Sequence, residues 1–314
     1  MALRIVRDWK RLGPEERGAS VAFGNFDGLH RGHQRVIAAA ALAARDDEAP
    51  LGVVSFDPHP RRFHQPDAEP FHLMSLDQQA RVLDAMGVDL FYVLPYGAEI
   101  AEMSDETFAV RVLAEGMGVR NVTAGSDVTF GKGRSGDPAA LKRYGAAHGF
   151  DVTVVKELGD AELGKFSSSD IRQALVDGRP DRAAEILGRP FAIEGVVQRD
   201  RQLGRKLGFP TANVPLDDYV RPRLGVYATR SLLADGRIVP GVANLGKNPT
   251  TGEVEARLEV WLFDFDEDIY GQTLETELVA FLRPEEKFDS IEALVQQVNS
   301  DAAKARSLLI PEIG

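Results

Sequence analysis

The chain contains no cysteine among its 314 residues. This absence excludes disulfide bonds, thiolate zinc sites and cysteine nucleophiles. Long apolar runs are also missing, because no stretch approaches the roughly 18 to 20 residues that a helix needs to cross a bilayer. The first twenty residues are too charged to form the apolar core of a signal peptide. We therefore expect a cytoplasmic protein with no membrane partner.

Basic residues are in deficit. Lysine and arginine number 37 against 48 aspartates and glutamates, which gives a formal charge of −11. Such a chain repels polyanions unless a local basic patch collects them, and the sequence has no such patch, so we expect no nucleic-acid partner. A small phosphorylated ligand is still compatible with this charge, because backbone amides at a helix N-terminus can hold phosphate.

The length and the balance of residue types indicate two folded domains. Apolar residues make up 44% of the chain and charged residues 27%, which is typical of globular proteins. A chain of this length usually forms two domains of ordinary size, each with its own core. The sequence gives no prediction of the oligomeric state.

The first part of the chain alternates β-rich runs with amphipathic helical stretches. This rhythm is typical of βαβ crossovers and predicts an α/β domain with a parallel, Rossmann-like sheet. The predicted strands are Ser20–Phe23, Leu51–Phe56, Leu90–Leu94, Asn121–Ala124 and Val152–Val155. The predicted helices are Gln34–Arg45, Leu76–Met86, Asp105–Gly116 and Pro138–His148.

The pattern changes near Leu187, where Gly188, Arg189 and Pro190 mark the end of a helix. We predict domains at residues 1–187 and 188–314. Beyond the boundary, β-rich segments separated by turn residues predict an antiparallel barrel or sandwich. These segments are Ile193–Val197, Gly225–Ser231, Ile238–Ala243, Ala256–Phe263 and Leu274–Phe281, and a closing helix is expected from about Asp289.

The segment GNFDGLHRGH, Gly24 to His33, comes immediately after the first predicted strand and leads into the first predicted helix. In a parallel sheet, ligands bind beyond the carboxyl ends of the strands, where a helix start offers free N–H groups to phosphate. Two imidazoles, His30 and His33, could donate hydrogen bonds to a phosphate as its charge rises in the transition state. The alternatives are that these histidines cap the helix or begin a metal site.

The H-x-G-H pattern resembles the signature of the nucleotidyltransferase superfamily. Three further segments, SFDPHP, GSDVTFGKGRSGD and FSSSDIR, resemble the bacterial FAD synthetase branch and follow in its order. The resemblance implies that His30 and His33 are catalytic and that ATP is bound by Phe23, Gly24, Phe26, Asp27, Gly32, Asp127, Ser167, Ser168 and Arg172.

Some details of this first region have a second interpretation. The serines before Arg172 can also be simple helix caps. The chain departs from the family at Ser169, Asp170 and Val128-Thr129. The residues expected to bind the flavin ring lie in and after SFDPHP and are Phe56, Pro58 and Phe63. Ordinary core packing is an alternative role for each of the two phenylalanines.

A second candidate site is LGRKLGFPTAN, Leu203 to Asn213. The hydroxyl of Thr211 and the amide oxygen of Asn213 are hard ligands that suit Mg²⁺ together with ATP phosphates. Taken alone, the segment PTAN could also be an ordinary turn and not a metal site. The segments GVYA, ANLGKNPTTG, LEVWLFDFDEDIYG and LRPEEKFDSIEAL extend the match and resemble bacterial riboflavin kinase.

The riboflavin kinase resemblance implies further roles. Thr211 and Asn213 would bind Mg²⁺, and Glu259 would accept the proton of the riboflavin 5′-hydroxyl. The residues implied in ATP binding are Gly204, Arg205, Gly208, Pro210, Thr211 and Asn213. Arg199, Asp200 and Leu203 depart from the family in the phosphate loop, where Asp200 removes a glycine's freedom and adds negative charge.

The combined hypothesis is a bifunctional enzyme. With ATP and Mg²⁺ it would phosphorylate riboflavin to FMN and then adenylate FMN to FAD, releasing pyrophosphate. One alternative is an adenylyltransferase whose kinase is weak or lost, because of the altered loop at Asp200. Another alternative is a flavin-binding sensor without catalysis.

Overall fold

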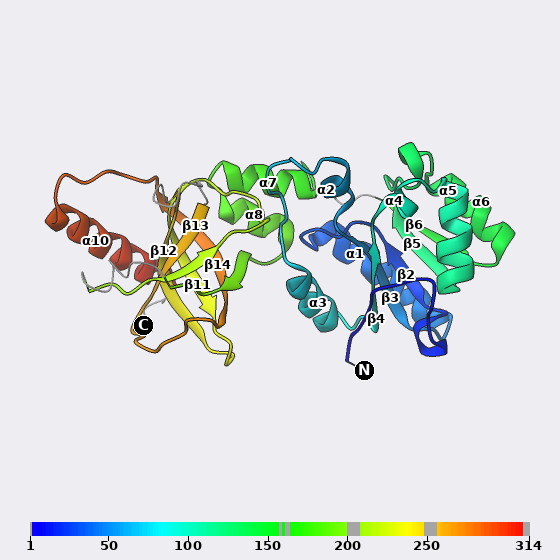
Figure 1. Ribbon diagram of the computed structural model, residues 1–314, viewed down its shortest axis with the longest axis horizontal. Helices are drawn as coiled ribbons and strands as arrows, with labels where there is room; N and C mark the ends of the chain where they lie inside the picture. The colour runs from blue at the N-terminus through cyan, green and yellow to red at the C-terminus, as the bar shows by residue number, and fades with distance from the viewer. Residues whose placement is uncertain (1, 157–158, 161–163, 200–207, 248–255, 310–314) are drawn as a thin grey trace. The chain divides into compact units, whose positions relative to one another are not determined.

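The computed structural model describes residues 2–156, 159–160, 164–199, 208–247 and 256–309 (Figure 1). The chain divides into two compact units, which we describe separately. The first contains Met1–Ala68 and Leu76–Ser167, and the second contains Glu69–Ser75 and Ser168–Gly314. The division falls earlier than the domain boundary expected at Leu187, and that boundary stays a prediction.

The first unit is built on a six-stranded sheet in which every pair of neighbours is parallel. The strand order is β1-β4-β3-β2-β5-β6. The strands are β1 (Arg4–Val6), β2 (Ser20–Phe23), β3 (Leu51–Asp57), β4 (Leu90–Pro95), β5 (Asn121–Gly125) and β6 (Asp151–Val155). The predicted parallel α/β sheet is confirmed, and the edge strand β1 was not predicted.

The order of these strands reverses at β2. From β2 the chain crosses to β3 and β4 on one side and later returns to β5 and β6 on the other. The register places Phe23 beside Ala124, so the loops that follow β2 and β5 leave the same edge of the sheet. In open parallel sheets this reversal creates the crevice where ligands bind.

Helices complete the first unit. They are η1 (Pro14–Glu16), α1 (Arg31–Asp46), α2 (Pro60–His64), α3 (Leu76–Ala85), α4 (Ala98–Ala101), α5 (Asp105–Thr107), η2 (Phe108–Met117), η3 (Lys132–Arg134) and α6 (Pro138–His148). The helix predicted over 105–116 is a short α-helix that continues as the π-helix η2. A short hairpin pairs β7 (Gly159–Asp160) with β8 (Gly164–Lys165).

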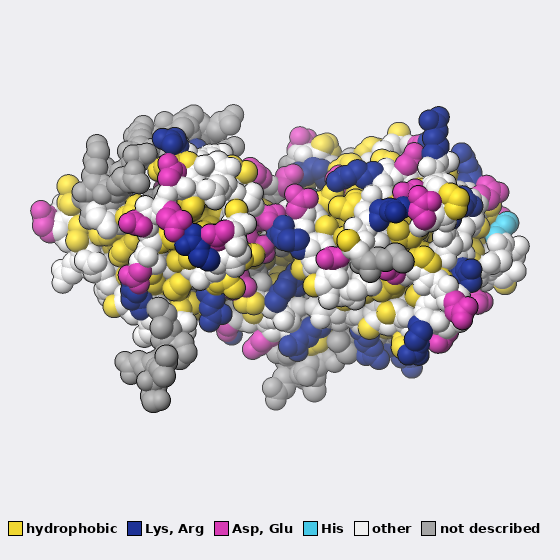
Figure 2. All heavy atoms as spheres, turned by 90° about the horizontal axis from the view of Figure 1, so that it is seen from below, with side chains coloured by type: hydrophobic (Ala, Val, Ile, Leu, Met, Phe, Trp, Pro, Cys, Tyr) yellow, Lys and Arg dark blue, Asp and Glu magenta, His cyan; other side chains and the backbone are white. Residues whose placement is uncertain are grey.

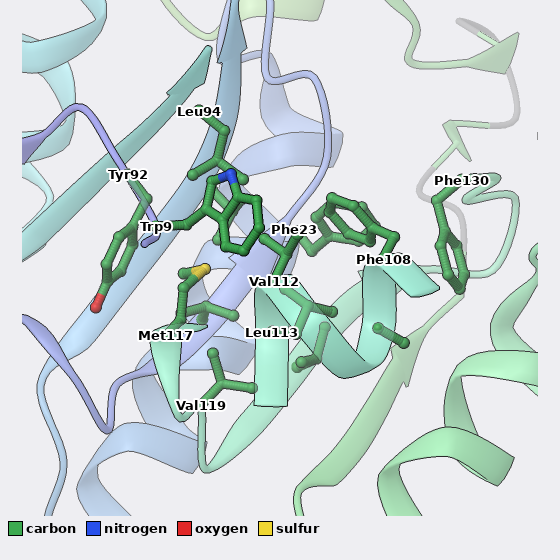
Figure 3. Close-up of a cluster of buried hydrophobic side chains, with 14 of the residues drawn as sticks. Trp9, Phe23, Tyr92, Leu94, Phe108, Val112, Leu113, Met117, Val119 and Phe130 are labelled. Atoms are coloured by element: carbon green, nitrogen blue, oxygen red, sulfur yellow. The ribbon is translucent and has the colours of Figure 1, made fainter. Parts of the chain in front are cut away.

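The apolar side of η2 packs against the sheet. Figure 3 shows its side chains gathered with Trp9 and with residues from the neighbouring strands. The labelled members of this core are Trp9, Phe23, Tyr92, Leu94, Phe108, Val112, Leu113, Met117, Val119 and Phe130. Burial of these side chains stabilises the folded unit by about 25 cal/mol for each Å² of apolar surface removed from water. This core therefore holds the ends of the strands in place.

The second unit contains a six-stranded sheet with antiparallel neighbours in the order β10-β13-β12-β11-β14-β9. An isolated bridge joins Gln198, which follows β9, to Asn213 on β10, so the two edges of the sheet approach each other and the sheet curls into a barrel. The strands are β9 (Phe191–Val196), β10 (Ala212–Pro215), β11 (Gly225–Leu232), β12 (Ile238–Lys247), β13 (Ala256–Leu262) and β14 (Thr273–Arg283). Of the two predicted architectures, the barrel is confirmed.

Among the described residues, the helices that accompany this barrel are α7 (Ser168–Val176), α8 (Pro180–Leu187) and α10 (Ile291–Leu309). Helix α10 is the closing helix expected from about Asp289, and it packs on the outer face of β11 and β12 through Ala302, Ala305 and Leu309. The ion pair between Arg283 and Asp301 joins the end of β14 to α10 at 2.8 Å.

Charged side chains are mixed on the face shown in Figure 2, where Lys and Arg alternate with Asp and Glu rather than gathering in one place. Within the described residues, no helix is both long and apolar enough to span a membrane.

Candidate functional site

The turn between β2 and α1 has an unusual backbone. Phe26, Gly28 and Leu29 have φ values of 45°, 86° and 44°. Such values are strained for residues other than glycine, and strain of this kind tends to occur at functional sites. The side chains of Phe26, Asp27 and Leu29 are nevertheless buried. The turn is therefore folded tightly against the body of the unit, and it brings the N-terminus of α1 to the carboxyl end of β2.

His30 is the N-cap of α1. Its Nδ1 accepts hydrogen bonds from the backbone N–H groups of Gly32 at 3.1 Å and His33 at 3.3 Å. The helix-cap interpretation is therefore confirmed for this residue. Because Nδ1 is the acceptor, the proton of the neutral ring lies on Nε2, on the edge directed away from the helix. The ring that caps the helix therefore carries its proton on Nε2.

His33 stacks on His30. The ring centroids are 3.6 Å apart with an interplanar angle of 22°, and the ring of Phe26 approaches His33 edge-on at 5.2 Å. Burial lowers the pKa of His33 well below its ordinary value, and the nearby His30 lowers it further. His33 is therefore neutral at neutral pH. Its Nδ1 is shielded from solvent and has no hydrogen-bond partner among the described residues.

Gly32 makes this arrangement possible. A Cβ at this position would lie 2.9 Å from Cε1 and 3.0 Å from Nδ1 of His30. Any side chain would therefore push the His30 ring away from the two N–H groups that it caps. The metal-site alternative gains no support, because the described residues contain no group of three or more His, Cys, Asp or Glu side chains that could hold a metal.

The other predicted ATP-binding residues of the first unit lie in different environments. Gly24 follows β2, and Asp127 is an exposed residue after β5, so both follow the strands at which the strand order reverses. A Cβ at Gly125 would lie 3.0 Å from Asp127 Oδ1. Phe23 and Phe26 have buried rings, so only their backbone groups can reach a ligand.

The predicted flavin-binding aromatics converge on Tyr96, a residue that we did not predict. The Tyr96 ring lies 5.4 Å from that of Phe56 and 5.5 Å from that of Phe63. His64 Nε2 is 3.0 Å from the Tyr96 hydroxyl. Burial raises the pKa of Tyr96, and the positive charge of Arg134 opposes this rise. The signal for Tyr96 was its place immediately after β4.

Pro58 lies beside this aromatic cluster in the chain and follows a cis peptide bond with Asp57. Ser55, earlier in the SFDPHP segment, is buried and donates from Oγ to the carbonyl oxygen of Asn25 at 3.3 Å. This bond ties the end of β3 to the histidine turn.

The FSSSDIR segment leads into helix α7, which begins at Ser168. Ser167 belongs to the first compact unit, whereas Ser168 and Arg172 belong to the second. Arg172 donates from Nε to the carbonyl oxygen of Phe71 at 2.7 Å, and its guanidinium lies 5.6 Å from the Phe71 ring. The phosphate-binding roles of these residues stay predictions.

In the second unit, the predicted magnesium ligand and the predicted base are neighbours. Asn213 on β10 is paired in register with Glu259 on β13. The Asn213 side chain is 7% exposed, and its Nδ2 donates weakly to the carbonyl oxygen of Thr211 at 3.5 Å. Its Oδ1 is buried and has no hydrogen-bond partner within the described residues. An orphaned buried amide oxygen is costly unless a ligand satisfies it.

Glu259 lies on the outer face of the barrel. Its neighbours Leu258 and Val260 are fully buried, whereas Glu259 is half-buried, as the alternation of β13 requires. The outer face places Glu259 beside Asn213 because residues directly opposite each other on neighbouring strands share a face.

A small cavity of about 50 Å³ is lined by Ala212 and Val260, the chain neighbours of Asn213 and Glu259, and not by that pair itself. Thr211 and Pro210 form part of its wall, and the loop after β13 forms another part. Its lining is Val197, Pro210, Thr211, Ala212, Val260, Leu262, Phe265, Asp266, Glu267, Asp268, Ile269 and Tyr270.

The phosphate loop before Thr211 is described only in part. Gly204 and Arg205, predicted to bind ATP, lie outside the described residues, as do Asp200 and Leu203. Gly208 is exposed with a φ of 95°, which favours glycine. Arg199 pairs with Asp268 at 3.6 Å and stacks over the Tyr270 ring at 4.6 Å.

The two units match two family models. Residues 13–170 match the FAD synthetase model, and residues 187–309 match the riboflavin kinase model. These matches, with the folds and sites above, define the class of protein as a two-domain transferase of flavin metabolism.

Similar proteins cover the whole chain. The bifunctional riboflavin kinase/FMN adenylyltransferase of Pseudomonas fluorescens is 40% identical, with 98% of this chain and 99% of the relative covered. The protein of the same name from Escherichia coli K12 is 36% identical, with 97% of each covered. The chain belongs to the bifunctional riboflavin kinase/FMN adenylyltransferase family.

A solved structure shares the full-length fold. It is described as a macrolide-efflux protein from Streptococcus pneumoniae and is 33% identical, with a TM-score of 0.85, covering 98% of this chain and 99% of that one. Its name differs from the names of the family models and of the relatives above. Its similarity to this chain supports the fold described above.

Proposed function

We propose that this protein makes FMN and then FAD, each with ATP. The second unit phosphorylates riboflavin, and the first unit transfers an adenylyl group from ATP to FMN with release of pyrophosphate. The observation that carries the proposal is that two separate polar sites lie on two units, each matched by the family model of one of these activities.

For adenylyl transfer, an oxygen of the FMN phosphate attacks the α-phosphorus of ATP. The new P–O bond forms as the bond to pyrophosphate breaks, and no covalent enzyme intermediate is needed. Negative charge grows on the oxygens around the α-phosphorus during this step. The Nε2–H of His30, the neutral ring of His33 and the N-terminus of α1 are the donors placed to stabilise that charge.

For phosphorylation, Glu259 accepts the proton of the riboflavin 5′-hydroxyl while that oxygen bonds to the γ-phosphorus of ATP. The bond between the γ-phosphorus and the leaving ADP oxygen breaks. Positioning supplies much of the acceleration in such reactions, and a well-placed base adds about 10²- to 10⁴-fold.

Magnesium is the metal that we propose for the kinase site. The donor set fits it, because the buried Oδ1 of Asn213 lacks a partner within the described residues and Thr211 precedes it by two residues. When bound, Mg²⁺ neutralises charge on the ATP phosphates. Asn213 and Thr211 would hold it beside Glu259, in the part of the site next to the phosphate loop.

We also propose a cytoplasmic location. Both reactions consume ATP, and the absence of cysteine fits a reducing compartment.

The test separates riboflavin, FMN and FAD by chromatography after incubation of the purified protein with riboflavin, excess ATP and Mg²⁺. The expected result is FMN that appears first and then gives way to FAD. Conversion of added FMN without any conversion of riboflavin would show that the altered loop at Asp200 has disabled the kinase. Unchanged flavins in both assays would favour a flavin-binding sensor.

Two variants separate the sites within this assay. Glu259→Gln should accumulate no FMN from riboflavin and still convert added FMN to FAD. His30→Ala should show the opposite pattern, with FMN accumulating and FAD absent. If both variants lost both activities, the assignment of one reaction to each unit would be wrong.

A further inference from the structure

A third polar residue continues the row that contains Asn213 and Glu259. Asn244 on β12 is paired in register with Glu259 on β13, on the side opposite Asn213. The three side chains therefore share the outer face of the barrel, one on each of three adjacent strands. Adjacent strands are about 4.8 Å apart, so Asn244 lies about one strand spacing from the predicted base.

The amide of Asn244 is available for a ligand. The residue is half-buried, and its side chain makes no hydrogen bond within the described part of the chain. Two residues of β12, Val242 and Gly246, lie on the same face as Asn244, one on each side of it along the strand. Val242 belongs to the apolar contact with α10, whereas Gly246 has no side chain. Asn244 thus stands where the apolar contact with α10 ends.

Glu285 reaches the same place from the segment after β14. A Cβ on Gly246 would overlap Glu285 Oε1 and would lie 2.9 Å from Asn244 Nδ2. Because Gly246 has no side chain, the Glu285 carboxylate and the Asn244 amide both border the space that its Cβ would occupy. The segment that carries Glu285 is anchored by Arg283, whose ion pair with Asp301 has side chains only 15% and 7% exposed.

The side chains of Asn213, Glu259 and Asn244 differ in the chemical groups that they can bind, in that order across the three strands. The proposed phosphate and magnesium end is at Asn213, the proton acceptor Glu259 is in the middle, and an amide with a carboxylate lies at the other end. The riboflavin alcohol that reacts is the end of a chain that carries three secondary hydroxyls. An extended carbon chain of bonds of about 1.5 Å advances about 1.25 Å per bond, so one strand spacing corresponds to about four bonds. The secondary hydroxyls would therefore fall beside Asn244 when the 5′-hydroxyl is at Glu259.

We infer that Asn244, together with Glu285, binds the secondary hydroxyls of the ribityl chain and makes the kinase selective for flavins with a polyol side chain. Hydroxyls both donate and accept, and an amide beside a carboxylate satisfies both needs. A site built to bond hydroxyls discriminates strongly against an analogue that lacks them. This inference rests on the proposed kinase function of the second unit.

The experiment compares two substrates with the full chain, ATP and Mg²⁺. One is riboflavin, and the other is the same flavin ring with a 5-hydroxypentyl side chain, which keeps the terminal alcohol and lacks the three secondary hydroxyls. We expect Asn244→Ala to lower kcat/KM for riboflavin about tenfold, equivalent to about 1.4 kcal/mol, and to change that for the hydroxypentyl flavin less than about twofold.

Two further variants sharpen the test. Glu285→Gln changes an exposed residue, so it should fold normally, and it should reduce the preference for riboflavin in the same direction. Asn299→Ala is a matched control, because it makes the same change on the exposed surface of α10 and should leave both substrates unaffected. Quenching of flavin fluorescence without ATP gives the corresponding change in Kd.

Equal losses for the two substrates in Asn244→Ala and in Glu285→Gln would overturn the inference, because they would indicate a role in folding or in orienting Glu259. Failure of the proposed function gives a different result, in which the wild-type protein phosphorylates neither substrate.

Discussion

Replacement of Gly32 by alanine tests whether the geometry of the histidine turn supports adenylyl transfer. The new Cβ would lie 2.9 Å from His30 Cε1, so the ring must retreat by at least about 0.5 Å to restore ordinary contact. The Nδ1 hydrogen bonds at 3.1 and 3.3 Å would then lengthen, and two backbone N–H groups would lose their cap.

Two magnitudes follow for Gly32→Ala. Loss of an N-cap costs about 1 kcal/mol of stability. A displacement of about 1 Å at a reacting centre can cost about 10²-fold in rate, so a shift of half that size should slow FAD formation roughly 10- to 100-fold. The catalytic loss should therefore be clear while the protein remains folded.

The assay for Gly32→Ala follows conversion of FMN to FAD by chromatography under saturating ATP. Phosphorylation of riboflavin, measured in the same preparation, is the internal control, because the kinase site lies on the other unit. The expected result is a large loss of FAD formation with kinase activity near the wild-type value. Wild-type FAD formation would refute the argument that the His30 cap sets the catalytic geometry.

Three other perturbations have defined outcomes. Asn213→Ala should raise the Mg²⁺ concentration needed for half-maximal riboflavin phosphorylation by at least about tenfold, as a magnesium titration would show. The pKa of His33 is lowered in the folded state, so the unfolded chain binds the extra proton first, and stability should fall as the pH drops below the ordinary value of 6.5. Thermal unfolding between pH 7 and pH 5 checks this, and His33→Gln should flatten the dependence. Asp301→Ala leaves the Arg283 guanidinium without its buried partner and should cost about 3–5 kcal/mol in denaturant unfolding, whereas Asp235→Ala, at an exposed ion pair, should cost less than about 1 kcal/mol.

Much of the fold could be predicted because its signals are local. The strand Ser20–Phe23 and the helix Pro138–His148 have the bounds that their patterns predict. Apolar periodicity and capping residues act within a few positions, so they can be recognised in one sequence. Strand β10 was missed because it is short and contains Pro215, and proline usually argues against a strand.

Features that depend on distant pairing could not be predicted. The segment Glu69–Ser75 belongs to the second compact unit, where His72 forms a bridge with Tyr219. The alignment of Asn244 with Glu259 depends on the register between β12 and β13. Motifs identified Glu259, but only the register identifies the residue beside it.

Burial also changes the meaning of predicted site residues. Phe23 immediately precedes the site motif and Phe26 lies within it, yet their exposed fractions are 3% and 2%. The Phe23 ring packs with the rings of Phe56, Phe108 and Phe130 in the core, and the Phe26 ring contacts His33 edge-on. A motif marks residues that must be present together, but it does not separate those that touch the ligand from those that hold the ligand-binding residues in place.

The spacing of H-x-G-H follows from three physical requirements that one helix start satisfies. His30 must be the N-cap, because only there can its Nδ1 receive the free N–H groups of the first turn. Position N2 must be Gly32, because the capping ring occupies the space of a Cβ. Position N3 must be His33, because its ring then stacks on the first at 3.6 Å. The cap consumes the acceptor nitrogen of His30 and so keeps the proton on the opposite edge of the ring. A substitution that abolishes the cap should therefore change the tautomer as well as the position of the histidine, even where the rest of the helix is intact.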